Sequence, residues 1–192
     1  TLESRGLGDV YKRQGLLADP KFAGGAYEDP PEVGIRAFAR IWAGWGPSQA
    51  FYRNKLHLDL GQATAADHIS EFWEPNFLAF DANDLLGMMH TWQVANIADN
   101  KIYNGDFEAA CKAIQAKTIL MPCKTDLYFP VADNEIQASL MSNTELRPIP
   151  SDWGHIAGAP GLNPVDSAFI DNAHRESVSY THLTLPTMQV VG

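Results

Sequence analysis

An aspartate and a histidine stand where the chain could carry an acid–base pair. Asp126 lies in a loop after an apolar stretch, and His155 lies in a loop after a second strand-like stretch. In such a pair the histidine takes a proton from a serine hydroxyl and returns it to the leaving group. The carboxylate fixes the tautomer of the histidine and stabilises the imidazolium. The two residues therefore predict the acid and base of a catalytic triad.

The order and spacing of the two residues support this interpretation more than their types do. An aspartate in a loop can equally cap a helix or close a turn, and Gly154-His155 can be a plain turn. Asp126 and His155 are 29 positions apart, which leaves room for one crossover helix and one strand. Both residues would then emerge at the carboxyl edge of adjacent parallel strands, where α/β enzymes place their sites.

The serine of such a triad is not found in the sequence. It usually lies in a Gly-x-Ser-x-Gly motif on a turn between a strand and a helix, and no such motif occurs in the 192 residues. Ser48 has no strand before it and is expected to cap the next helix. We therefore expect the chain alone to be inactive and a longer parent protein to be the enzyme.

Other polar side chains give weaker indications. Asp81-Ala82-Asn83-Asp84 begins like a calcium-binding loop. Leu85 and Trp92, however, stand where that loop needs oxygen ligands, so a capped helix is favoured.

The remaining histidines and the cysteines indicate no metal site. His57, His68 and His90 lack paired metal-ligand spacing and are expected to be surface or satisfied histidines. Cys111 and Cys123 are expected to be small core side chains, without a disulfide framework. We therefore predict no metal, and the residues that would bind a cofactor stay unknown.

The second half of the chain shows the pattern that would position the pair. Helices are expected at 107–114, 133–141 and 164–170, and strands at 118–121 and 145–150. The first strand is an apolar run typical of burial on both faces, and two prolines confine the second to a sheet edge. This order predicts a parallel sheet with helical crossovers. Two strands are too few to be stable alone, so the sheet is expected to be incomplete.

The first half is expected to be helical, with breaks at turns. One helix is expected after Asp29-Pro30-Pro31, one near 51–56, one capped by Asp67 and one capped by Asp81. Pro75 should kink or shorten the third of these. Four of the five tryptophans lie in this half. They fit either a helical subdomain that packs on itself or a lid that lines a substrate pocket.

Both ends of the chain resemble translated sequencing adapters. Residues 4–14 resemble the translation of a transposase library adapter, and residues 178–187 resemble the reverse complement of its partner. Such segments are excluded from fold reasoning. The expected organisation is an adapter-derived, disordered 1–14, a helical lid-like region 15–104, the C-terminal part of an α/β core 105–177, and an adapter-derived, disordered 178–192.

Composition narrows the class of protein. With 45% hydrophobic and 19% charged residues, the chain is typical of a single soluble domain. A net charge of −9 argues against a nucleic-acid partner, and no apolar run approaches the roughly 20 residues that span a membrane. The sparse cysteines fit a reducing cytoplasm. We therefore expect small-molecule partners, without nucleic acid or membrane.

Several short stretches, in order along residues 15–177, resemble the C-terminal half of the homoserine O-acetyltransferase family of the α/β-hydrolase superfamily. These stretches are Asp19-Pro20, Gly24 to Tyr27, Gly34 to Arg40, Phe80 to Asp84, Ala113 to Thr118, Lys124 to Pro130, and Gly154-His155.

The resemblance implies an α/β class of fold: a helical lid over about 22–102, then the last two parallel strands and flanking helices of an α/β-hydrolase core. It implies that Asp126 is the triad acid and His155 the triad base. It also implies ping-pong acyl transfer in methionine biosynthesis, in which a serine takes an acyl group from acyl-coenzyme A and passes it to a hydroxyl. Acyl-coenzyme A is then a cosubstrate, no cofactor is expected, and the parent could form a homodimer.

One position departs from the family. Ile156 follows His155, where the family commonly has an aspartate that helps to hold the amino-acid acceptor. An alkyl side chain offers no partner to an ammonium group, which argues against homoserine as acceptor. A related acyltransferase, a serine esterase with water as acceptor, and a non-catalytic helical interaction module all stay open.

Overall fold

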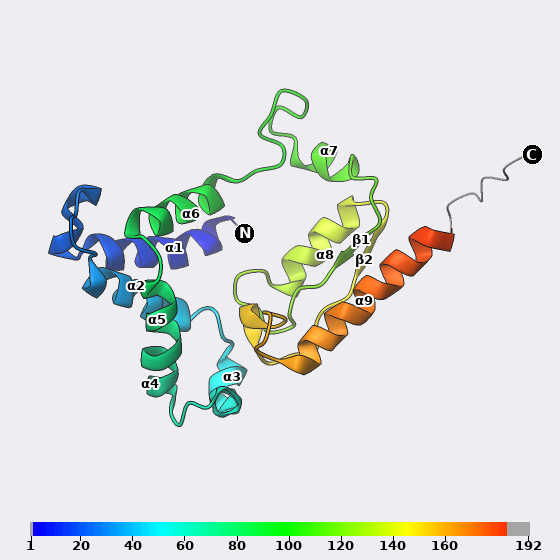
Figure 1. Cartoon of the computed structure of the whole chain (residues 1–192). Coiled ribbons are helices and arrows are strands. Elements are labelled where there is room, and N and C mark those ends of the chain that lie inside the picture. Colours follow the sequence, from blue (N-terminus) through cyan, green and yellow to red (C-terminus); the bar gives the residue numbers. More distant parts are fainter. Residues whose placement is uncertain (1, 184–192) are drawn as a thin grey trace, which may run out of the picture.

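The computed structural model describes residues 2–183, which form a helical half and a smaller α/β half (Figure 1). The helical half contains α1 (Leu2–Leu17), η1 (Pro20–Gly25), α2 (Glu32–Ala43), α3 (Gln49–Arg53), η2 (Leu56–Leu60), α4 (Ala65–Asp67), η3 (His68–Trp73), α5 (Glu74–Leu78) and α6 (Ala82–Val94). The α/β half contains α7 (Phe107–Lys112), β1 (Thr118–Leu120), α8 (Val131–Leu140), β2 (Thr144–Leu146), η4 (Gly154–Ile156) and α9 (Pro164–Leu183).

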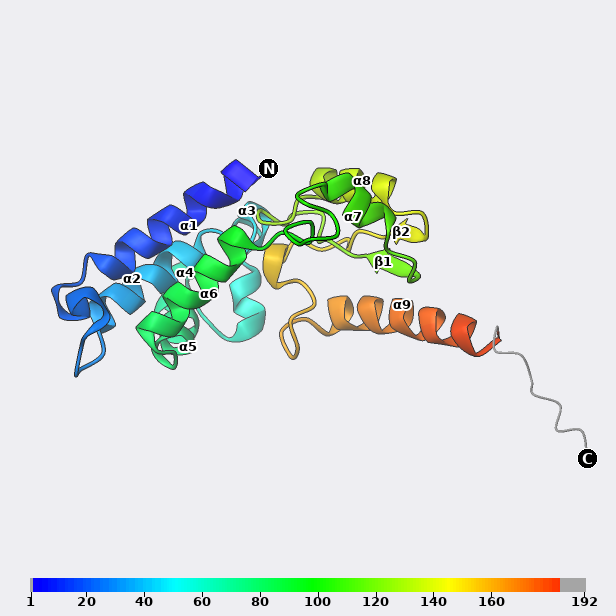
Figure 2. The ribbon, with the colours of Figure 1, turned by 90° about the horizontal axis from the view of Figure 1, so that it is seen from above.

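The two strands form the parallel pair that the sequence predicts. Thr118 lies opposite Thr144, and Leu120 lies opposite Leu146. Helices α8 and α9 lie on opposite faces of this pair (Figure 2). Strand β2 ends before the predicted boundary at 150, although the amides of Arg147 and Ile149 still donate to the carbonyls of Leu120 and Pro122, each at 2.8 Å. The regular ladder is interrupted at Pro122, which has no amide hydrogen to donate across to the β2 segment. The fold is thus the incomplete α/β sheet that was predicted.

Strand β1 is less buried than its apolar sequence predicts. All three of its residues are half-buried. The amide of Thr118 donates to Asn143 at 2.9 Å, and the carbonyl of Leu120 accepts from Arg147 at 2.8 Å. Alternate residues of a parallel strand direct their hydrogen-bonding groups to opposite edges, so Ile119 turns its own groups away from β2. Within residues 2–183 no further strand pairs with that edge.

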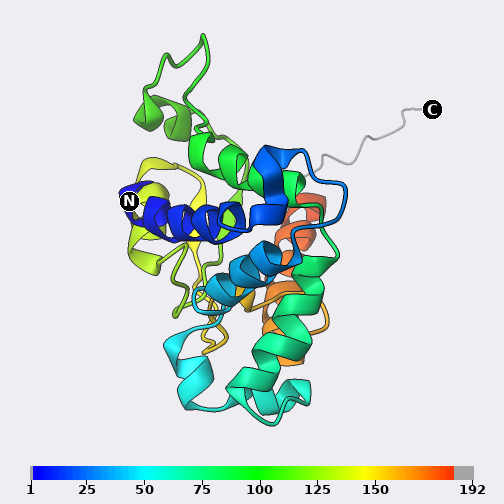
Figure 3. The ribbon, with the colours of Figure 1, turned by 90° about the vertical axis from the view of Figure 1, so that its left-hand side faces the viewer.

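The structure corrects the expectation of disorder at both ends. Residues 2–17 form α1, which packs along α2 (Figure 3). Lys12 and Leu16 are fully buried, so contacts far apart in the sequence stabilise a segment whose own pattern indicates no core. Helix α9 continues to residue 183, and residues 1 and 184–192 lie outside the described part. The adapter origin of the two ends stays a prediction.

Two apolar clusters organise the helical half. The first joins α1, α2 and α6 and contains Leu16, Phe22, Ile35, Phe38, Ala82, Leu85 and Met89. The second contains Ala39, Ala43, Phe51, Trp73, Trp153 and Ile156. Since Trp153 and Ile156 flank Gly154-His155, this second cluster fixes the His155 loop against the helical half.

The third predicted helix begins earlier than expected, and Pro75 does not end it. Thr64 is the N-cap, because its hydroxyl accepts from the Asp67 amide at 3.1 Å while the Asp67 carboxylate accepts from the Thr64 amide at 3.0 Å. The Glu74 amide then donates to Ile69, five residues back. This π-helical turn carries the chain into the proline without a break.

His68 is a fully buried histidine in this helical half. Its Nε2 accepts a hydrogen bond from Trp73 Nε1 at 2.9 Å, and its Nδ1 lies 3.2 Å from Gln62 Oε1. The ring is therefore neutral, with its proton on Nδ1. Burial lowers the pKa of His68 to about 4, with a smaller contribution from His57.

This pKa predicts a loss of stability in mild acid. Unfolded His68 binds a proton below about 6.5, whereas folded His68 binds one only near pH 4. Protons therefore favour the unfolded chain between these values. We expect His68 to lower the free energy of unfolding by up to about 3 kcal/mol as the pH falls from 6.5 to 4.

Urea unfolding at pH 7 and pH 4.5 measures this effect. His68→Gln should be less stable than the unchanged protein at pH 7 but should lose less stability on acidification. His90→Gln removes an exposed histidine and is the matched control. An unchanged pH dependence in His68→Gln would contradict the prediction.

Candidate active site

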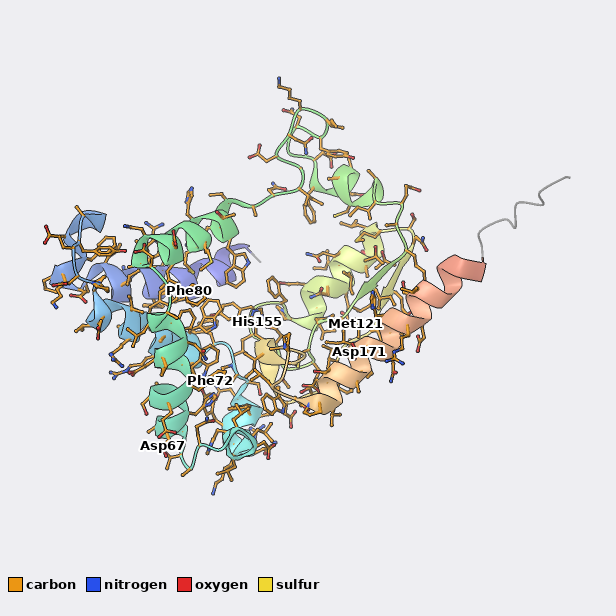
Figure 4. The ribbon with its side chains drawn as sticks, viewed as in Figure 1. Asp67, Phe72, Phe80, Met121, His155 and Asp171 are labelled. Atoms are coloured by element: carbon orange, nitrogen blue, oxygen red, sulfur yellow. The ribbon has the colours of Figure 1, made fainter. Side chains whose placement is uncertain are left out.

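Asp126 and His155 meet at the junction of the two halves. His155 Nδ1 lies 3.1 Å from Asp126 Oδ2. The Asp126 side chain is 7% exposed and the His155 side chain 25%, so the pair is shielded but reachable. Figure 4 shows His155 between the helical half, which carries Phe72 and Phe80, and the α/β half, which carries Met121. The two side chains are thus in contact, as the triad interpretation requires, while the catalytic role of the pair stays a prediction.

The turn after β1 holds the Asp126 carboxylate in place. Its Oδ1 accepts hydrogen bonds from the amides of Tyr128 at 2.7 Å and Phe129 at 3.1 Å, which leaves Oδ2 for His155. Burial by itself raises the pKa of Asp126, but the hydrogen bond with His155 and the two amides outweigh burial and lower that pKa. Asp126 is therefore a carboxylate at neutral pH.

A close backbone contact positions His155. Its amide donates to the carbonyl of Gly46 at 2.8 Å. Gly154 has φ +72°, and a Cβ there would lie 2.6 Å from the Ser48 amide nitrogen. Ser48 is the N-cap of α3, as predicted, because its hydroxyl accepts from the Phe51 amide at 2.9 Å. The link between α2 and α3 thus supports the histidine loop and supplies no nucleophile.

The hydrogen bond to Asp126 assigns the roles of the two ring nitrogens of His155. With the proton on Nδ1 and donated to the carboxylate, Nε2 of the neutral ring carries the lone pair. Within residues 2–183 this nitrogen makes no hydrogen bond. Nε2 is the atom that would take a proton from a serine hydroxyl brought beside it.

A cavity of about 300 Å³ adjoins the pair. Besides Asp126 and His155, its walls are Met121, Pro122, Cys123, Phe129, Asn134, Ile149, Gly154 and Ala157. The size of this cavity suits a small acyl or alkyl group.

Aromatic rings from both the helical half and the turn after β1 surround His155. The ring centroids of Tyr128, Phe129, Trp92 and Trp42 lie 4.9, 5.4, 6.3 and 6.4 Å from that of His155. Trp42 comes from α2 and Trp92 from α6. The helical half therefore packs against His155, which favours a lid over a subdomain that packs only on itself. Sequence reasoning did not single out these rings, although the concentration of tryptophans was a signal.

The other candidate residues have structural roles. Asp81 caps α6 by accepting from the amides of Asn83 at 2.8 Å and Asp84 at 3.3 Å, as predicted. His57 is buried, with Nδ1 2.9 Å from the Gln62 carbonyl oxygen. The two cysteines are buried and not linked by a disulfide. In the described range no cluster of metal-ligating side chains forms, and no helix could cross a membrane.

The sequence of the chain is similar to those of known esterases and acyltransferases. No protein-family model matches the chain. A probable esterase of Corynebacterium glutamicum is 34% identical over 141 residues, which cover 72% of this chain and 40% of that protein. An ethyl acetate hydrolase of Pseudomonas veronii is 31% identical over 160 residues, with 82% and 44% covered. A homoserine O-acetyltransferase of Pasteurella multocida is 30% identical over 185 residues, with 85% and 47% covered.

Solved structures show the same likeness. An acetylester hydrolase from Corynebacterium glutamicum matches 93% of this chain and 51% of its own, with a TM-score of 0.87 and 28% identity. A homoserine O-acetyltransferase from Bacillus anthracis matches 88% of this chain and 48% of its own, with a TM-score of 0.70. At 20% identity, this likeness shows the fold alone. The chain spans about half the length of the proteins it matches.

Proposed function

Since this chain is a homologue of the esterases and homoserine O-acetyltransferases of the α/β-hydrolase superfamily, we propose that it is the acid–base part of a serine esterase. The observation that carries the proposal is the contact of 3.1 Å between Asp126 and His155 beside a cavity of about 300 Å³. We propose small-molecule esters as substrates and the cytoplasm as the location.

The proposed reaction begins with a serine that lies outside this chain, in the half present in the longer relatives. His155 Nε2 removes the serine proton as the oxygen attacks the ester carbonyl. The imidazolium then gives that proton to the departing alcohol, and an acyl-serine remains. Water attacks this intermediate, with His155 again as base, and releases the acid and the free serine. Asp126 holds the ring and stabilises the imidazolium throughout.

Two observations favour water over an amino acid as the acyl acceptor. Ile156 follows His155 and is 8% exposed within the second apolar cluster, so it offers an ammonium group no charged partner. The probable esterase and the ethyl acetate hydrolase, at 34% and 31% identity, are also slightly more similar in sequence to this chain than the Pasteurella multocida homoserine O-acetyltransferase, at 30%.

Acyl transfer from acyl-coenzyme A to a hydroxyl is the second candidate function. It is favoured by the family resemblance in residues 15–177 and by the 30% identity to the Pasteurella multocida homoserine O-acetyltransferase. Both candidates use the same pair, and they differ in the acyl donor and in the molecule that receives the acyl group.

A hybrid protein tests the proposal. Residues 15–177 replace the homologous part of the Corynebacterium glutamicum esterase, whose first half supplies the missing strands and a serine. We expect the folded hybrid to hydrolyse 4-nitrophenyl acetate and ethyl acetate, whereas the 192-residue chain does not.

The acceptor is tested in the same hybrid with acetyl-coenzyme A and homoserine. Release of acetate without O-acetylhomoserine supports the esterase, and faster formation of O-acetylhomoserine supports the second candidate. A hybrid whose nucleophilic serine is changed to alanine is the control for background hydrolysis. A hybrid that folds like the parent esterase but has no activity would contradict both.

A further inference from the structure

Beside His155, three aromatic rings surround the ammonium group of a buried lysine. Lys12 is fully buried, although lysine usually keeps its charged end in water. Its Nζ lies 3.6 Å from the ring centroid of Trp42, 4.3 Å from that of Tyr128 and 5.6 Å from that of Trp92. We call these three rings the aromatic cage.

The aromatic cage is built from parts of the chain that only the fold brings together. Trp42 lies on α2, Trp92 on α6, and Tyr128 in the turn after β1. The three centroids lie 5.2 to 5.8 Å from one another, with interplanar angles from 29° to 44°. Such a group of ring faces carries negative electrostatic potential and binds cations when water is excluded.

The cation that occupies the aromatic cage in this structure comes from a segment that is predicted to be foreign to the rest of the chain. Lys12 belongs to residues 1–14, which are predicted to be adapter-derived, whereas all three rings belong to residues 15–177. A parent protein without residues 1–14 would keep the rings and lack this lysine. Lys12 is therefore a tethered cation in a site that residues 15–177 form.

We propose that the aromatic cage binds the organic ammonium group of a small ligand and so holds that ligand against the catalytic pair. Tyr128 is the ring nearest to His155, with centroids 4.9 Å apart. A cation in the cage and an ester carbonyl at His155 Nε2 can therefore belong to one small molecule. The class of ligand is an ester or alcohol with a quaternary ammonium a few bonds from its oxygen.

This proposal goes beyond the esterase proposal, because binding alone tests it and no catalysis is needed. The probes are choline and 3,3-dimethylbutan-1-ol, which has the same shape without the charge. The protein is the 192-residue chain, unchanged and as Lys12→Ala, and binding is followed by tryptophan fluorescence at constant ionic strength.

We expect Lys12→Ala to bind choline about tenfold more tightly than it binds 3,3-dimethylbutan-1-ol, because only choline gains the cation–π attraction. The unchanged chain should bind choline about tenfold more weakly than Lys12→Ala, because Lys12 competes as a tethered ligand. Lys12→Gln keeps a side chain of similar length without the charge. It carries the same expectation and serves if the alanine variant does not fold.

The ring variants complete the test in the Lys12→Ala background. Trp42→Leu should abolish the preference for choline. Trp45→Leu should keep this preference, because Trp45 is not one of the cage rings, although its ring centroid lies 5.9 Å from that of Tyr128. Equal binding of choline and the neutral alcohol by a folded Lys12 variant would overturn the proposal. A preference for choline that survives Trp42→Leu would also overturn it.

Discussion

Replacing His155 by alanine in the hybrid esterase is expected to lower kcat by about 10⁴- to 10⁶-fold, the loss seen when a triad base is removed. The alanine variant keeps the cavity and the Asp126 carboxylate but has no group that can take the serine proton. Steady-state hydrolysis of 4-nitrophenyl acetate measures the loss. KM should change much less than kcat, because the imidazole acts on the reacting atoms and not on ground-state binding.

Asp126→Asn in the same hybrid is expected to lower kcat by about 10⁴-fold. Asparagine keeps an oxygen for the amides of Tyr128 and Phe129, so the turn should survive. Its NH₂ group would face His155 Nδ1 and favour the tautomer with the proton on Nε2, where the base must be free. The change therefore disables the histidine without removing it.

Matched controls separate these effects from general damage to the protein. His90→Ala and Asp99→Asn replace an exposed histidine and an exposed aspartate elsewhere in the chain. Both should retain activity within about twofold, as is usual for surface changes away from special features. If a folded His155→Ala hybrid kept activity within tenfold of the unchanged hybrid, His155 would not be the base.

The contact between Asp126 and His155 could be predicted because it depends on local order. The apolar run before Asp126 and the crossover between Asp126 and His155 determine which sheet edge receives the two side chains. Helix caps are equally local, since Ser48 and Asp81 bond to amides two or three residues ahead. The cap at Thr64 was not predicted, because Thr64 and Asp67 form a capping box within one turn. In the sequence, Asp67 alone resembles an N-cap residue.

The aromatic surroundings of His155 could not be predicted because they depend on contacts between distant segments. Trp42 and Trp92 have helical spacing that fits any buried helix face, and only the packing of α2 and α6 brings both toward His155. Helix α1 differs from expectation for the same reason. Its residues have no core pattern of their own, yet Leu16 completes the cluster around Phe38.

Gly154→Ala is expected to destabilise the hybrid by about 2–5 kcal/mol and to displace His155. An L-residue at the φ of +72° found here costs about 1–2 kcal/mol. The added methyl group would also lie 2.6 Å from the Ser48 amide nitrogen and 2.8 Å from the Gly46 carbonyl oxygen. These are backbone atoms that cannot swing aside, so the crowding adds about 1–3 kcal/mol. The loop would have to move, and the hydrogen bond from His155 to Gly46 would lengthen or break.

Gly161→Ala separates strain from crowding. Gly161 has a similar φ of +80°, but no atom lies within 4 Å of the position that its Cβ would take. This variant should therefore lose only about 1–2 kcal/mol, and its kcat should stay near that of the unchanged hybrid. Urea unfolding and ester hydrolysis, measured on both variants, give the difference. If both variants lost the same stability and the same activity, the contact between the histidine loop and the link from α2 to α3 would not be what positions His155.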